Sequence, residues 1–131
     1  MSLHLLLVED KPATREQLLQ IIAQSPFKVS CANDGLEGLN LSKSEQFHMV
    51  LVDHKMPLMD GLALIKSLRQ LPAYQAAPIL LMTTQDAGQV APLAEKAGAN
   101  LCLSKPVDGK RLLELLNDLP ATISHPQQSH V

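Results

Sequence analysis

The stretch LVDHKMPLMDG, residues 51–61, ends an apolar run on the acidic residue Asp53 and then continues into a loop. The loop carries Pro57, Asp60 and Gly61, which are residue types that favour turns. A continuous apolar run of this kind predicts a buried strand. Asp53 therefore lies at the end of a strand that is expected in the core. Its role depends on which residues stand at the ends of the other strands.

Apolar runs of strand length recur along the chain and alternate with segments of helical spacing. The runs cover residues 3–8, 27–31, 48–53, 79–83 and 100–103. Such alternation is typical of βαβ units and of a parallel sheet with helices on both faces, whose central strands are apolar throughout. We therefore expect an α/β protein with five strands.

The segments between the runs predict helices. The clear ones start after Pro12 or cover residues 34–45, 62–71 and 108–119, with Pro120 ending the last. The remaining helix falls in residues 86–97, where Pro92 would cost about 3 kcal/mol in a helix interior. We expect that helix to be short and to begin near Ala91. Residues 1–120 then form one domain, and residues 121–131 form a polar tail or the start of a linker.

The composition is that of a single globular domain and excludes several functions. A length of 131 residues fits one domain. A net charge of −2 without a cluster of Lys and Arg argues against nucleic-acid binding by this chain alone. The apolar runs are too short to cross a bilayer, and the N-terminus lacks the pattern of a signal peptide. We expect a cytoplasmic protein without a membrane partner.

Polar residues follow the strands at the points where ligands bind an open parallel sheet, outside the carboxyl ends. Glu9 and Asp10 follow the first run, Asp53 and Thr83 end the third and fourth, and Lys105 follows the fifth. Carboxylates packed together repel one another, and a hard cation such as Mg²⁺ relieves that repulsion. An ammonium and a hydroxyl suit a phosphoryl group, and an Asp can accept one as a nucleophile. The set is equipped for phosphoryl transfer to a carboxylate.

Four motifs in register resemble the receiver domain of two-component response regulators, over about residues 3–119. They are LLLVED, LVDHKMPLMDG, MTTQ and LSKP, with 30 positions from Asp53 to Thr83 and 22 from Thr83 to Lys105. The resemblance implies a flavodoxin-like three-layer sandwich: a five-stranded parallel sheet of order 2-1-3-4-5, flanked by five helices. Chemotaxis regulators of this family are a standard example of that order.

The resemblance also implies roles for the residues at the strand ends. Asp53 would accept a phosphoryl group from a phosphohistidine on a histidine kinase or a histidine phosphotransfer protein. Lys105 would pair with the phosphoryl oxygens, and Thr83 would move to hydrogen-bond them. Mg²⁺, or Mn²⁺ in its place, would be held by Glu9, Asp10, Asp53 and the main-chain carbonyl of Lys55.

Such a domain is a signalling module and not an enzyme, beyond its self-catalysed phosphorylation and dephosphorylation. Its output would pass to a downstream protein or to a covalently linked output domain. The family further implies a Pro after the Lys, here Pro106, often behind a cis bond.

Two other functions are compatible with such a fold. A degenerate receiver would bind proteins independently of phosphorylation, which the intact acceptor, acid pair, Thr and Lys disfavour. An aspartate-nucleophile phosphatase would need a second Asp two residues after the first, where this chain has Lys55. His54 follows the acceptor, but consecutive strand residues point in opposite directions, so we expect it to be non-catalytic. We expect the same of His4, His48, His125 and His130.

The two cysteines raise two further expectations. Both lie in apolar strand-like segments, so we expect small buried side chains, and the implied strand order places Cys31 and Cys102 at opposite sheet edges, about 19 Å apart and too far for a disulfide. Cys102 also stands where receivers usually carry the Tyr or Phe whose rotamer follows the Thr. We therefore expect an unusual output face over residues 86–106.

Overall fold

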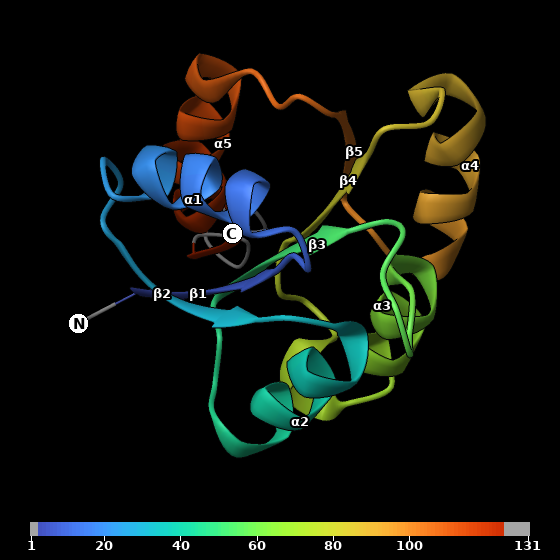
Figure 1. Ribbon diagram of the computed structural model, residues 1–131. Helices are drawn as coiled ribbons and strands as arrows, with labels where there is room; N and C mark the ends of the chain where they lie inside the picture. The colour runs from blue at the N-terminus through green and yellow to red at the C-terminus, as the bar shows by residue number, and fades with distance from the viewer. Residues whose placement is uncertain (1–2, 125–131) are drawn as a thin grey trace.

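Five parallel strands form one sheet in the order β2-β1-β3-β4-β5 in the computed structural model, which describes residues 3–124 and the side chains up to residue 118 (Figure 1). The strands are β1 (Leu3–Val8), β2 (Phe27–Ala32), β3 (Met49–Asp53), β4 (Ile79–Thr83) and β5 (Leu101–Ser104). The helices are α1 (Pro12–Ile22), α2 (Gly35–Ser44), α3 (Gly61–Arg69), α4 (Ala87–Ala97) and α5 (Gly109–Ser124), with a 3₁₀ turn η1 (Pro72–Tyr74). The expected α/β sandwich and its strand order are confirmed.

The sheet separates two apolar cores, because alternate strand residues point to opposite faces. One core, which we call the α3/α4 face, lies under α2, α3 and α4 and takes the strand residues Leu6, Val8, Val50, Val52, Ile79 and Leu81. The other, the α1/α5 face, takes Leu5, Leu7, Met49, Leu51, Leu80 and Met82. Figure 1 shows α1 and α5 together on one side of the sheet. Burial on both faces explains why the central strands are continuously apolar.

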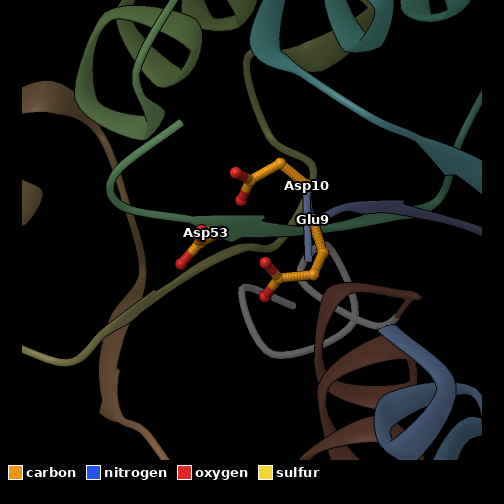
Figure 2. Close-up of side chains that lie close together, drawn as sticks. All are labelled: Glu9, Asp10 and Asp53. Carbon is orange, nitrogen blue, oxygen red and sulfur yellow. The ribbon is translucent and has the colours of Figure 1, made fainter. Parts of the chain in front are cut away.

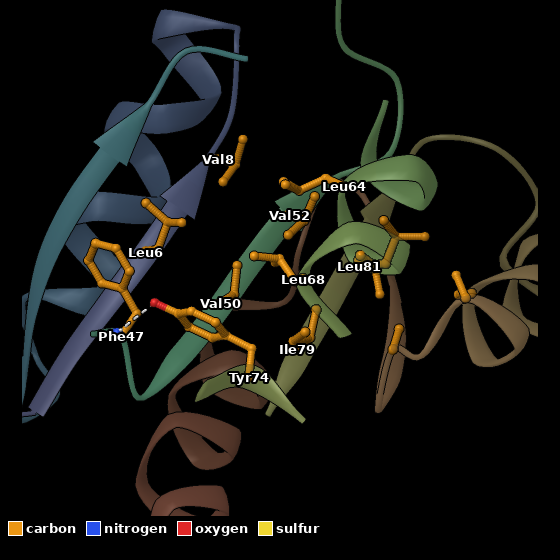
Figure 3. Packing of buried hydrophobic residues seen from close by; sticks show 14 of the residues in the cluster. Leu6, Val8, Phe47, Val50, Val52, Leu64, Leu68, Tyr74, Ile79 and Leu81 are labelled. Carbon is orange, nitrogen blue, oxygen red and sulfur yellow. Dashed lines mark hydrogen bonds between the residues drawn. The ribbon is translucent and has the colours of Figure 1, made fainter. Parts of the chain in front are cut away.

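A buried tyrosine joins the α3/α4 core to the loop before β3. Tyr74 is 1% exposed, and its hydroxyl oxygen lies 2.7 Å from the carbonyl oxygen of Glu45 and 2.9 Å from that of Ser42. The same oxygen accepts the main-chain N–H of Phe47 at 3.1 Å (Figure 3). The hydroxyl thus provides hydrogen-bond partners for the buried main-chain groups of Ser42 and Phe47.

At the amino end of the sheet, one guanidinium ties several connections together. Arg69, the last residue of α3, donates hydrogen bonds of 2.6 to 3.0 Å to the main-chain carbonyls of Tyr74, Ala77 and Gly98 and to the side chain of Asn100. Gly98 has a φ of 117°, and a Cβ there would lie 2.6 Å from Cγ of Arg69. The chain therefore needs glycine at this helix end both for its backbone angle and for the close approach of the arginine.

The expectation of a short fourth helix beginning near Ala91 is wrong, because α4 begins at Ala87 and contains Pro92. The side chain of Asp86 accepts the N–H of Gly88 at 2.8 Å and so caps the helix at this earlier point. Pro92 removes the hydrogen bond that would reach the carbonyl of Gly88. Gly88 is exposed, so water can hydrate that carbonyl.

The last helix also differs from the expectation. It continues past Pro120 to Ser124, so the proline does not end the helix here, although a proline in a helix interior costs about 3 kcal/mol. The first four residues of the expected tail, 121–131, are thus part of α5. The remainder, with His125 and His130, lies outside the described residues.

The cysteines lie on opposite edge strands, β2 and β5, as the strand order implied. The expectation that both are buried is wrong, because Cys31 is exposed and Cys102 is half-buried. An edge strand has a neighbour on one side only, so its side chains are less covered than those of the central strands. Among residues 3–124, no helix is long and apolar enough to cross a membrane.

Candidate functional site

The carboxyl end of the sheet brings together three carboxylates. Glu9 and Asp10 follow β1, Asp53 ends the adjacent strand β3, and the register pairs Val8 with Val52. One carboxylate oxygen from each of the three acidic residues lies within 4.8 Å of the others (Figure 2). Glu9 is fully buried and Asp53 is 4% exposed, while Asp10 is half-buried. Strands far apart in the sequence thus place three acids at one point, as the sequence predicted.

Lys105 reaches this cluster from the loop after β5. Its Nζ lies 2.8 Å from Oε1 of Glu9 and 2.9 Å from Oδ1 of Asp53. Burial would lower the pKa of Lys105, but its hydrogen bonds to the two carboxylates and their charges outweigh burial and raise it. The lysine is therefore a permanent cation in contact with Asp53. The Lys105–Pro106 peptide bond is cis, as the resemblance implied.

One ammonium does not balance three carboxylates. Burial raises the pKa of Glu9, and the negative charge of Asp53 raises it further, although the hydrogen bond from Lys105 opposes both. Within the described residues, Oδ1 of Asp10 is buried and has no hydrogen-bond partner. A buried carboxylate oxygen without a donor, beside two further carboxylates, suits a hard divalent cation with oxygen ligands. The donor set therefore fits Mg²⁺.

The loop after Asp53 is held against the site by the start of α3. The N–H of Gly61 donates to the carbonyl of His54 at 2.8 Å, and the side chain of Asp60 caps α3 by accepting the N–H of Ala63 at 2.9 Å. A Cβ on Gly61 would lie 2.3 Å from the carbonyl oxygen of Asp53. The turn signal Asp60-Gly61 thus has a second function here, because glycine lets α3 begin against the main chain of Asp53.

Arg15 supports the acid pair from α1. Its Nη1 donates to the carbonyl of Glu9 at 2.9 Å and to the side-chain oxygen of Asn33 at 2.6 Å. These two bonds fix the main chain at the end of β1, from which the carboxylate of Glu9 points into the cluster. Nothing in the sequence distinguishes Arg15 from any other charged residue on a helix surface, so this supporting contact could not be predicted.

Thr83 ends β4 beside the acidic cluster, but its hydroxyl is bonded elsewhere. Its Oγ1 lies 2.9 Å from Nδ1 of His54 and accepts the N–H of Gln85 at 3.0 Å. The register pairs Asp53 with Met82, which places His54 next to Thr83 on the α3/α4 face. Thr83 and His54 are 1% and 3% exposed. The hydroxyl of Thr83 is therefore engaged within the protein interior.

The protein interior favours the uncharged form of the His54 side chain. Burial lowers its pKa, the charge of Lys55 lowers it further, and the charges of Asp60 and Asp53 oppose these effects in part. One ring nitrogen therefore carries a lone pair that can accept a hydrogen bond.

The structure brings together Glu9, Asp10, Asp53 and Lys105, with Thr83 on the neighbouring strand end. Lys55 follows directly after His54 with an exposed side chain. The sequence reasoning missed the contact of His54 with Thr83. Strand alternation correctly separated His54 from Asp53, but the partner on the opposite face depends on the register of β3 and β4, for which the sequence carries no signal.

Comparisons with known proteins find one family. The sequence model of the response regulator receiver domain family matches residues 5–117 of this chain. The transcriptional activator protein PfeR of Pseudomonas aeruginosa is 41% identical over 105 residues, and the match spans 80% of this chain but only 33% of PfeR. The solved chemotaxis response regulator CheY4 of Vibrio cholerae is 28% identical with a TM-score of 0.82, covering 88% of this chain and 97% of that one.

A third protein shares the fold. It is the receiver domain of a sensor histidine kinase from Pseudomonas aeruginosa, solved with a magnesium ion in its active-site cleft. It is 22% identical with a TM-score of 0.80, over 88% of this chain and 95% of that domain.

Proposed function

This chain belongs to the response regulator receiver family, and from that premise we propose that it is a phosphoacceptor domain of a two-component system or phosphorelay. Asp53 takes a phosphoryl group from the phosphohistidine of a histidine kinase or a histidine phosphotransfer protein. The observation that carries the proposal is the contact of Lys105 with Asp53, at 2.9 Å, beside two further carboxylates. A surface acid used only for solubility would need none of these neighbours.

The transfer forms one bond and breaks one. An oxygen of the Asp53 carboxylate attacks phosphorus, the nitrogen–phosphorus bond of the donor breaks, and the donor imidazole keeps the electron pair and takes a proton from solvent. Lys105 already touches Oδ1 of Asp53, so its ammonium lies where it can pair with the phosphoryl oxygens that arrive there. Burial of the acceptor keeps that attraction strong, because little water screens it.

A metal ion completes this proposal. Mg²⁺, or Mn²⁺, held by Glu9, Asp10, Asp53 and the main-chain carbonyl of Lys55, would supply positive charge to the phosphoryl oxygens. The unpartnered oxygen of Asp10 supports a cation at this place. The magnesium ion in the cleft of the sensor-kinase receiver domain supports the same choice of metal.

The proposal extends to partners and location. The chain spans a third of the length of PfeR, so output from a covalently linked domain and output through a separate downstream protein are both proposed. The receiver unit would extend to the end of α5 at Ser124 in either case. The reaction would take place in the cytoplasm, where ATP-dependent kinases make phosphohistidine.

The test is uptake of a phosphoryl group or its mimic. Wild-type protein, Asp53→Ala and the control Glu95→Gln, which alters an exposed carboxylate on α4, are incubated with acetyl phosphate or beryllofluoride with and without Mg²⁺. We expect metal-dependent modification of the wild type and the control, and none of Asp53→Ala. No modification of the wild type would refute the proposal in favour of a receiver that binds partners without phosphorylation.

A further inference from the structure

The hydroxyl of Thr83 is hydrogen-bonded to partners other than Asp53. Its oxygen accepts the N–H of Gln85 at 3.0 Å and lies 2.9 Å from Nδ1 of His54. A threonine hydroxyl has a single proton to donate. The N–H of Gln85 occupies one lone pair of this oxygen, and in the His54 tautomer that is unprotonated at Nδ1 the 2.9 Å contact is a hydrogen bond that Thr83 donates.

A phosphoryl group on Asp53 competes for this same proton. Phosphoryl oxygens carry negative charge and only accept hydrogen bonds, so Thr83 can bind them only by donating. We propose that His54, unprotonated at Nδ1, is a positioning residue: it accepts the Thr83 hydroxyl proton in the resting arrangement and loses that hydrogen bond when Asp53 is phosphorylated. This inference rests on the proposed function, because it concerns the switch that phosphorylation would operate.

The geometry of the sheet makes His54 the side chain that would respond to a movement of Thr83. On the α3/α4 face, Cys102 is paired with Leu81, which precedes Thr83 by two residues on β4. The partner of Thr83 itself on β5 is Ser104, which is exposed. The small thiol of Cys102 has no ring to swing. On the other side of Thr83, the buried ring of His54 is in direct contact.

Loss of the hydrogen bond from Thr83 is unfavourable for the buried side chain of His54. The ring is 3% exposed, so Nδ1 would be left without a partner in the interior, which is unfavourable for any buried polar atom. The ring must therefore turn or find another donor. The carbonyl of His54 accepts the N–H of Gly61, the first residue of α3, so a change at residue 54 is passed to the start of α3. The displacement of Thr83 is thus transmitted to β3 and the start of α3, and no aromatic side chain on β5 is needed.

Substitution of His54 tests the inference by affinity. His54→Leu removes the acceptor, and His54→Asn restores one, because the side-chain oxygen of Asn can occupy the place of Nδ1. Titration of beryllofluoride at saturating Mg²⁺ should give about 2- to 10-fold tighter binding for His54→Leu, since one internal hydrogen bond no longer competes. His54→Asn and the control His48→Leu, at an exposed position, should bind as the wild type does. Equal affinity of all four proteins would overturn the inference.

A second test uses the wild-type protein and therefore does not require the His54 variants to fold. With ¹⁵N-labelled histidine, Nδ1 of His54 should show the resonance of an unprotonated acceptor at rest, and that resonance should move when beryllofluoride binds while those of His4 and His48 stay. A protonated Nδ1 at rest, or an unmoved resonance in protein that has bound beryllofluoride, would overturn the inference alone. Wild-type protein that binds no beryllofluoride would overturn the proposed function and this inference with it.

Discussion

Gly61→Ala should disrupt the candidate site through the main chain. The added Cβ would lie 2.3 Å from the carbonyl oxygen of Asp53 and 2.8 Å from Cδ1 of Leu81, so α3 or the end of β3 must shift by roughly 1 Å to reach an ordinary van der Waals contact. Overpacking of this kind costs about 1–3 kcal/mol. Stretching the 2.8 Å bond from Gly61 to the carbonyl of His54 adds about 1 kcal/mol. We expect a loss of about 2–4 kcal/mol in the free energy of unfolding.

Urea denaturation measures the loss, and Gly88→Ala is the matched control. A Cβ on Gly88 meets only the capping side-chain oxygen of Asp86, at 3.2 Å, so a shift of a few tenths of an ångström relieves the contact. The higher helix propensity of Ala offsets the strain on this cap, and we expect a change below about 1 kcal/mol. Gly61→Ala should also weaken Mg²⁺-dependent beryllofluoride binding at least tenfold, since the displaced atoms belong to Asp53. An unfolding free energy within about 0.5 kcal/mol of the wild type would refute the reasoning, because the contact would then be relieved without cost.

Three further predictions follow from the contacts described above. Tyr74→Phe should lower the free energy of unfolding by about 1–3 kcal/mol in urea denaturation, because a buried main-chain N–H loses its acceptor; a change below about 0.5 kcal/mol would contradict this. Asp10→Asn should weaken Mg²⁺ binding at least tenfold in a metal titration without loss of thermal stability, because it removes a ligand and a repulsive charge together; unchanged affinity would remove this residue from the proposed metal site. With Cys102 in place of an aromatic, hydrogen exchange with and without beryllofluoride should change less over residues 86–106 than at the start of α3, and the opposite order would contradict this.

The residues alone were sufficient to predict the parallel α/β fold and the acidic cluster. Parallel strands end at one edge of the sheet, so residues that follow apolar runs must meet there, whatever the details of packing. Glu9, Asp53 and Lys105 could therefore be placed together without coordinates. The resemblance to a known family added the order of the strands and the cis bond before Pro106, neither of which follows from hydrophobic periodicity.

Contacts that depend on register or on edge position could not be predicted. Whether His54 meets Thr83 is decided by the pairing of Asp53 with Met82, which a shift of one residue would abolish. Cys31 lies in an apolar segment yet is exposed, because β2 is at the edge of the sheet. Pro92 misled the prediction of α4, since propensity alone does not include the cap that Asp86 provides.

The bonds of Arg69 at the amino end of the sheet give α4 a fixed pivot. Its last turn is tied at Gly98, whereas its first turn begins at Ala87, four residues after Thr83, where no such bond from Arg69 reaches. A helix of 11 residues is about 16 Å long, so a rotation of about 10° around the tied end moves the free end by about 3 Å. Any rotation of α4 is therefore largest at Ala87 and vanishes at Gly98, so the small exchange changes expected within residues 86–106 should be concentrated in its first turn.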